Sequence, residues 1–232
     1  MTQPIFLELG DEDVEVRVRR NAQARRMILR VCPTSGEVRL TMPKRASATS
    51  ARRFLDQHVD WICDERGKAH AIVPVSDGSM LDVEGYSRRV QFTGIAPRGV
   101  RLVDDAIVVG GPKDHAARRL NNWLRAEAKT RMIAASATYA EILGARYVRV
   151  SIGDMRSRWG SCSSRGTLRF NWRLLMAPPD VLHYVAAHEV AHLLEMNHSD
   201  RFWAHVERCI PDFEVHRRWL KKHGAALFAV KI

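Results

Sequence analysis

The sequence predicts an α+β fold, in which a β-rich N-terminal region precedes a C-terminal half built on a long helix and a helix carrying His188-Glu189-Val190-Ala191-His192. Three observations predict this class. Apolar and polar residues alternate early in the chain, which is typical of half-buried strands. Later stretches have the apolar spacing of amphipathic helices. A Gly-Gly-Pro sequence at 110–112 separates the two kinds of pattern.

The N-terminal region is expected to contain strands and one helix. Alternation over Val14–Val18, Met27–Val31 and Val38–Met42 predicts three strands in an antiparallel meander. A helix over 47–70 should follow, because apolar residues recur there at helical spacing. Short alternations over 80–109, interrupted by glycines and a proline, predict more strands.

We place the domain boundary at Gly111, which divides the chain into domains 1–111 and 112–232. The second domain should open with a long amphipathic helix over 113–143 that ends at Gly144. Its apolar stripe consists of Leu120, Trp123, Leu124, Ala128, Ala135, Tyr139 and Ile142.

Antiparallel strands should pack on this long helix, and shorter helices should follow. The expected elements are strands at 148–152 and 168–172, a helix from Pro178-Pro179-Asp180 to about Glu195, and helices at 199–208 and 212–223 ending at Gly224. The edge of the 168–172 strand is expected to hold an extended substrate through backbone hydrogen bonds. The alternative is a strand in the middle of the sheet whose alternate residues only pack.

Composition predicts a cytoplasmic protein that does not enter membranes. The start of the chain, Met1–Val14, lacks the apolar stretch of an export signal, and no segment approaches the roughly 20 apolar residues of a membrane helix. The four cysteines are far apart and form no CxxC pair, which fits reduced thiols.

The chain carries a net charge of +11, which should attract polyanions such as nucleic acid. Basic faces are expected on the 46–70 helix, through Arg52, Arg53, Arg66 and Lys68, and on the 113–143 helix, through Arg118, Arg119, Arg125 and Arg131. The alternative is a solvated basic surface without a nucleic-acid partner. The sequence predicts no particular oligomeric state.

The histidines of the 188–192 segment have the spacing of metal ligands. Residues four apart on a helix lie one above the other, so His188 and His192 present two imidazoles to one point. Zinc bound there lowers the pKa of a coordinated water to about 7, and Glu189 is placed to take its proton as a general base. Two surface histidines are the alternative.

His198 is the expected third ligand for one Zn²⁺ per chain. A break near Met196-Asn197, with Asn197 in the left-handed conformation, would fold the chain back toward the first two histidines. Three protein ligands leave a fourth position for water, as catalytic zinc requires. The chain does not match the metzincin pattern, because that pattern has Gly at the position of Glu195. A glutamate third ligand would have to be Glu207 or Glu214.

Other candidates near the chemistry are less specific. Arg158, Asn171 and Tyr184 are expected to contact substrate, and together with His183 they are the donors available for a transition-state oxyanion. Asn171, Glu195 or a backbone oxygen could orient a ligating histidine. Cys162 is a fourth ligand or, more simply, a small buried apolar residue. Phe202 and Trp203 are expected in the core.

Several segments resemble the YgjP-like metallopeptidases, which are relatives of the SprT and Spartan proteins. The resemblance is carried by Arg158-Trp159-Gly160-Ser161-Cys162-Ser163, by Leu168-Arg169-Phe170-Asn171-Trp172-Arg173-Leu174, by His188-Glu189-Val190-Ala191-His192, and by Asn197-His198-Ser199 with Phe202-Trp203. It is densest from Arg156 to Trp219. The resemblance implies a zincin-like catalytic domain, zinc held by His188, His192 and His198, and Glu189 as general base.

The predicted function is therefore hydrolysis of peptide bonds in a protein or peptide by zinc-activated water. One alternative is a metal-dependent hydrolase that acts on another substrate. Another is a basic nucleic-acid-associated protein, either a DNA-linked protease or a module with structural zinc. Glu189 argues against structural zinc, because such a site normally has four protein ligands and no use for a carboxylate beside them.

Overall fold

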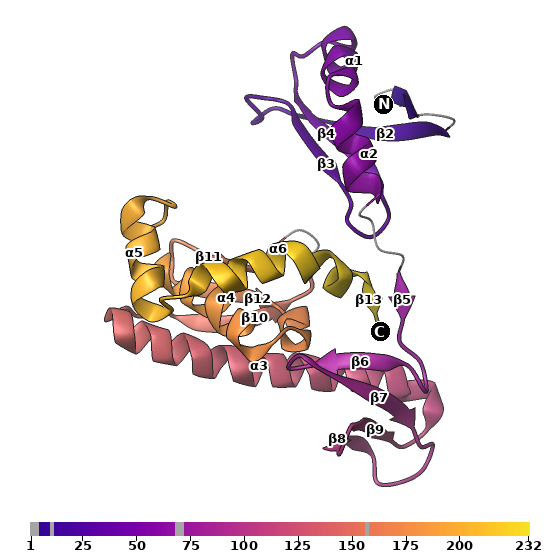
Figure 1. Ribbon diagram of the computed structural model, residues 1–232, viewed down its shortest axis with the longest axis vertical. Coiled ribbons are helices and arrows are strands. Elements are labelled where there is room, and N and C mark those ends of the chain that lie inside the picture. The colour runs from indigo at the N-terminus through magenta and orange to yellow at the C-terminus, as the bar shows by residue number, and fades with distance from the viewer. Residues whose placement is uncertain (1–4, 10–11, 68–71, 156–157) are drawn as a thin grey trace. The chain divides into compact units, whose positions relative to one another are not determined.

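A computed structural model of the chain describes residues 5–9, 12–67, 72–155 and 158–232. With 43% of the described residues in helices and 28% in strands, the chain has the predicted α+β class. It divides into two compact units, Met1–Val73 and Pro74–Ile232 (Figure 1).

The first unit contains a four-stranded sheet in the order β1 (Ile5–Leu9), β2 (Glu12–Asn21), β4 (Val38–Pro43), β3 (Ile28–Val31). The predicted antiparallel meander is wrong, because β2 pairs with β4 in parallel. β4 takes the central place since Val38, Leu40 and Met42 are almost fully buried, whereas β3 is only partly covered. The strand with the most complete apolar face lies where both neighbours shield it.

The helix predicted over 47–70 is two helices, α1 (Ala48–Asp56) and α2 (Val59–Gly67), and its last predicted residues lie outside the described ones. The Ser47 side chain caps α1 by accepting from the Ser50 amide. At the break, the His58 amide donates to Leu55 and the His58 ring contacts the Phe54 carbonyl at 2.7 Å. These local bonds replace the regular helical pattern between the two helices.

The second unit begins with a sheet that shares its core with the long helix. Its strand order is β6 (Met80–Val83), β7 (Tyr86–Phe92), β9 (Ala106–Gly110), β8 (Gly99–Val103). Val90 and Ile107 pack in one core with Leu120 and Leu124 of α3 (Ala116–Leu143). The chain divides into compact units after Val73, within the short strand β5 (Val73–Pro74), and the domain boundary predicted at Gly111 lies inside the second unit.

Helix α3 supports the second unit along its whole length (Figure 1). The residues at 113–115 form a separate turn, η1 (Lys113–His115), and Gly144 ends the helix with a φ of 65°, the left-handed conformation that favours glycine. Most of the predicted apolar stripe is buried, but Ile142 is 36% exposed. The small residues Ala128 and Ala135 on the buried side allow other elements to approach the helix closely.

A second, three-stranded sheet lies beside α3 in the order β10 (Arg149–Gly153), β12 (Thr167–Asn171), β11 (Gly160–Cys162). β10 and β12 are parallel, so the sheet is mixed, and β11 pairs antiparallel with β12. The expected edge role of the 168–172 strand is wrong, because β12 lies in the middle. β11 is an edge strand, and it contacts the helix that carries His188.

The remaining elements are helical: η2 (Trp172–Met176), α4 (Pro179–Ala191), α5 (Asp200–Cys209) and α6 (Phe213–Ala229), after which comes β13 (Val230–Lys231). α4 ends earlier than predicted. α6 continues through Gly224, contrary to the sequence expectation, because a Cβ there would lie 3.0 Å from the Trp159 indole. Gly224 thus serves packing instead of helix termination. No helix in the described part of the chain has the length and apolar character needed to cross a bilayer.

The burial of α3 leads to a stability prediction. Leu124 is fully buried, whereas Ile133 on the same helix is 41% exposed. Leu124→Ala should lower the free energy of unfolding by about 2–5 kcal/mol, because it removes buried methylenes and leaves a cavity. Ile133→Ala should change it by about 1 kcal/mol or less. Urea unfolding of both variants tests this, and equal losses would contradict the assigned packing.

Candidate metal centre

Helix α4 places His188 and His192 one turn apart near its C-terminal end. Pro178 and Pro179 begin the helix, and apolar residues cover most of its surface. The two imidazole centroids are 4.9 Å apart. Since the helix packs on α3, α5 and α6, both side chains project from a rigid element.

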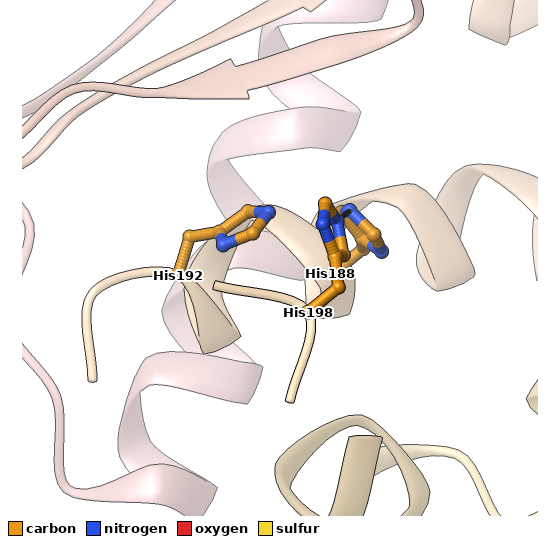
Figure 2. Close-up of side chains that lie close together, drawn as sticks. All are labelled: His188, His192 and His198. Carbon is orange, nitrogen blue, oxygen red and sulfur yellow. Dashed lines mark hydrogen bonds between the residues drawn. The ribbon is translucent and has the colours of Figure 1, made fainter. Parts of the chain in front are cut away.

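His198 reaches the same point from the segment between α4 and α5. The chain turns because the Leu193 and Leu194 amides donate hydrogen bonds to the carbonyls three residues earlier, those of Val190 and Ala191. Asn197 does not adopt the left-handed conformation expected of it, because this tightened turn makes the break. Ser199 then caps α5 by accepting from the Phe202 amide. Figure 2 shows the three rings gathered at the end of α4.

The spacing of the three imidazoles fits a metal ion. The Nε2 atoms of His188 and His198 are 3.2 Å apart, and one ligand atom from each histidine lies within 4.8 Å of the others. Two nitrogens bound to a tetrahedral zinc at about 2.05 Å would be roughly 3.3 Å apart. Among the described residues, these three histidines are the only group of His, Cys, Asp or Glu with metal-ligand spacing.

The environment favours the neutral forms of His188 and His192, the forms that bind a metal. Burial lowers the pKa of His188 to about 3, and the neighbouring His192, His198 and Arg217 add to the effect. Burial also lowers the pKa of His192. His192 Nδ1 lies 3.1 Å from the Glu195 carbonyl oxygen, which leaves Nε2 for the metal. Of the orienting groups weighed from sequence, this backbone oxygen is the one in contact.

Glu189 lies beside the histidines with its carboxylate 5% exposed. A Cβ at Gly160 would lie 2.4 Å from Glu189 Oε1, so glycine is required for strand β11 to approach this closely. Burial raises the pKa of Glu189 to about 8, and the charge of Arg158 opposes the rise. Oε2 is buried without a hydrogen-bond partner in the described part of the chain, which fits a group that awaits a ligand.

All these groups open into one cleft of about 280 Å³. Its lining consists of Gly160, Ser161, Cys162, His188, Glu189, His192, Met196 and His198. Sequence reasoning did not identify Gly160 or Met196 as part of the site. The signal for Gly160 was its place in the Arg158–Ser163 segment, but its contact with Glu189 depends on tertiary structure.

Aromatic residues form the wall behind the histidines. The Phe202 ring is fully buried, as predicted, and its centroid lies 4.4 to 4.8 Å from all three imidazoles. Trp203 is half-buried, and its ring lies 5.8 Å from that of His198. The Arg217 guanidinium packs over the Trp203 ring, 4.6 Å from its centroid. No motif in the sequence marks Arg217.

Cys162 lines the cleft but does not join the group with ligand spacing. Burial raises the pKa of its thiol to about 11, and the charge of Glu189 contributes. Cys162 therefore contributes to the wall of the cleft, and its place outside the group with ligand spacing disfavours the fourth-ligand alternative. Glu207 and Glu214, the alternative third ligands, are also outside the group, and Glu214 accepts from Arg217 at 2.8 Å.

The three predicted substrate-contacting residues have different surroundings. Asn171 is fully buried. Its side-chain oxygen accepts from the Arg173 backbone amide, and its side-chain amide donates to the Met155 carbonyl at 2.6 Å. It caps η2 and has no exposed polar atom for a substrate, contrary to the prediction. Tyr184 is 5% exposed and its ring lies 6.0 Å from that of His188. Arg158 is exposed near Glu189.

Three imidazoles around one point, with a glutamate in the same cleft, are the protein groups of mononuclear metallohydrolases. A family model described as "YgjP-like, metallopeptidase domain" matches residues 25–223. The chain therefore belongs to the YgjP-like metallopeptidase family, whose members are metal-binding hydrolases.

Two further comparisons add no argument about function. A crystal structure of the metallopeptidase zymogen of Pyrococcus abyssi abylysin is similar over 39% of this chain and 93% of that chain, with 26% identity and a TM-score of 0.36. None of the curated proteins compared with the chain is significantly similar to it.

The metal centre predicts a change in metal content. The wild-type protein should retain about one equivalent of zinc after dialysis, whereas His198→Ala should retain much less, because it removes one of three ligands. His205→Ala, a change outside the centre on neighbouring α5, is the control. Elemental analysis of the dialysed proteins measures both. Full retention by His198→Ala would exclude His198 as a ligand.

Proposed function

We propose that this chain is a zinc-dependent peptidase in which His188, His192 and His198 hold one Zn²⁺ and Glu189 acts as the general base. The observation that carries the proposal is the convergence of three imidazoles and a buried carboxylate on a single cleft. A zinc ion there would supply Lewis-acid chemistry, by acidifying water and polarising the scissile carbonyl.

Glu189 would move the protons of the reaction. It takes a proton from the attacking water at its carboxylate and delivers it to the nitrogen of the departing amine. Because the side chain is 5% exposed, the accepted proton is held within the cleft. Close packing against Gly160 restricts the carboxylate to positions beside the histidines.

Tyr184 and Arg158 remain candidates for contact with the substrate. Burial raises the pKa of Tyr184 to about 12, so its hydroxyl stays protonated and can donate a hydrogen bond to an oxyanion. Tyr184 precedes His188 by one helical turn, which places it on the same side of α4. Arg158 offers a positive charge next to β11, where a substrate carbonyl or carboxylate would be attracted.

Strand β11 supports a peptide as the substrate. It is the edge strand of its sheet, and Gly160, Ser161 and Cys162 all line the cleft. An extended peptide can add to such an edge through main-chain hydrogen bonds and bring a scissile carbonyl close to the histidines. A hydrolase of small molecules would have no use for an unpaired strand edge at this place. A purely structural zinc would in turn normally have a fourth protein ligand.

The role of Glu189 predicts a separation of chemistry from metal binding. Glu189→Gln keeps the size of the side chain but cannot accept the proton, so hydrolysis of an unfolded protein should fall about 10²- to 10⁴-fold. Zinc content should stay near one equivalent. Glu207→Gln, an exposed change on α5, is the matched control and should retain full activity. Undiminished hydrolysis by Glu189→Gln would refute the proposed base.

The contact between Gly160 and Glu189 gives a second prediction. Gly160→Ala should reduce kcat at least about tenfold, because the new Cβ would displace the carboxylate from its position beside the metal. Zinc content should be unchanged, since Gly160 is not a ligand. Gly67→Ala is the control, because nothing lies within 4 Å of a Cβ at that position. A normal kcat for Gly160→Ala would show that Glu189 does not need this position.

A further inference from the structure

One segment of the first unit is strongly basic. Residues 16–55 contain eleven Arg or Lys residues and a single acidic residue, Glu37, which gives the segment a local net charge of +10. Ten of the eleven are arginines. Acidic residues before and after the segment bring the first unit to +3, and the second unit carries the other +8.

Four of these arginines lie together on one face of the sheet. In the strand registers, Arg39 of β4 pairs with Arg17 of β2 and with Arg30 of β3, so the three stand side by side across neighbouring strands. Arg19 lies two positions beyond Arg17 and points to the same side. All four are exposed. We call these residues, Arg17, Arg19, Arg30 and Arg39, the basic sheet face.

The opposite face of the sheet holds the core of the unit. Val16, Val38 and Leu40 are fully buried there in one cluster with Leu55 of α1 and Ile62 of α2. The alternation of the strands therefore sends apolar side chains to the helices and arginines to the other side. The helices cover only one face of this sheet.

The basic sheet face contains too little negative charge to balance it. Glu37 contacts both Arg17, at 2.7 Å, and Arg39. Among the described residues, neither Arg19 nor Arg30 has a carboxylate partner. Asp13 and Glu15 point to the same side of β2 as Arg17, but they lie before it, toward the end paired with β1, so they border the basic sheet face at one end only. Like charges opposite each other in a sheet destabilise it, so the arrangement is not explained by the stability of the unit.

Other basic residues are occupied by contacts within the chain. Arg20 donates to the carbonyls of Lys44 and Ala46, and Arg52 binds Asp56 and the Phe6 carbonyl. The basic face predicted on the 113–143 helix is also largely engaged: Arg119 donates to Pro112, Arg125 to Asn121, and Arg131 to Glu84 and Glu127. Of the arginines named on the two predicted helices, the exposed Arg53 and Arg118 have no such contact among the described residues but stand singly, whereas the sheet holds four arginines side by side.

We propose that the basic sheet face binds the phosphate backbone of nucleic acid without reading its sequence. Arginine suits this partner because its planar guanidinium donates to phosphate oxygens in pairs. The strands hold the four guanidinium groups on a grid of about 4.8 Å across and about 6.7 Å along the sheet. Between the four arginines the sheet holds no aromatic or amide side chain that could contact bases. The interaction is therefore electrostatic.

A nucleic acid fits this surface better than an anionic membrane does. Surface-bound proteins insert a broad apolar face beside their basic residues. On the arginine side, the sheet exposes two separate apolar residues, Phe6 of the edge strand β1, which is 51% accessible, and Ile28, which is 36% accessible. This surface is too polar to enter a bilayer, whereas phosphates in a nucleic acid require only charge and hydrogen-bond donors.

The test measures binding of the full-length protein to a labelled 30-nucleotide single strand and to a 30-base-pair duplex over a range of salt. Four phosphate contacts should give a log–log slope of about −2.8 on the single strand and about −3.6 on the duplex. Binding should then weaken roughly 50-fold and 150-fold between 50 and 200 mM salt. Replacing Arg17, Arg19, Arg30 and Arg39 by Gln should abolish most of this dependence.

The control variant removes the same charge elsewhere. Arg118, Lys129, Arg146 and Lys221 are exposed residues of the second unit, and their replacement by Gln should leave the slope within about one unit of the wild type. If the first variant does not fold, Arg19→Gln with Arg30→Gln should lose about half of the slope, because these two arginines have no carboxylate partner.

Three results would overturn the proposal: no binding to either nucleic acid at 50 mM salt, equal losses in the two fourfold variants, or face-dependent binding to phosphatidylserine vesicles in place of nucleic acid. Glu189→Gln should bind nucleic acid as the wild type does, so the outcome is independent of the proposed peptidase chemistry.

Discussion

The enclosure of helix α4 is the constraint on which the metal centre depends. α3, α5, α6 and β11 surround the helix, so His188 and Glu189 have little contact with water. Removing ionisable groups from water disfavours their charged forms, which explains the low pKa of His188 and the raised pKa of Glu189. The same desolvation prepares neutral imidazoles for a cation and, without one, favours the protonated form of Glu189; a cation bound beside the group would return it to the carboxylate form. Burying these ionisable groups costs free energy of folding, and active sites commonly bear this cost to obtain shifted pKa values.

The C-terminal helix supports this enclosure from the far side of β11. The Trp159 ring stacks on Phe228 of α6 at 4.2 Å, and the absence of a side chain at Gly224 allows the indole to approach. Trp159 directly precedes Gly160, which packs against Glu189. The position of the carboxylate thus depends on a continuous series of contacts from α6 through the aromatic pair to the edge strand.

Buried polar contacts secure the same region. The Arg173 guanidinium packs on the Trp172 ring at 4.5 Å, pairs with Asp154 and donates to the Val230 carbonyl at 3.0 Å. These bonds tie the end of α6 to the segment that follows β12. Asn171, which the sequence placed among substrate contacts, belongs to this network, because its side chain caps η2. Polar residues close to an active-site motif can therefore serve the fold alone.

Local patterns in the sequence determined much of the secondary structure and the set of metal-binding candidates. The four-residue spacing of His188 and His192 places them on one side of a helix wherever that helix lies, and alternation marks strands such as β4 in the same local way. The third histidine was also predictable, since only a short turn separates it from α4. These inferences depend on contacts between residues close in the chain.

Tertiary structure alone decided which elements became neighbours. The parallel pairing of β2 with β4, the unit boundary after Val73 and the central place of β12 depend on which apolar faces pack together, and alternation does not record partners. Gly160 could not be recognised as the contact of Glu189, because 29 positions of sequence separate them and only folding brings them together. Periodicity reports the face that a residue occupies, whereas the packing of distant segments determines what that face meets.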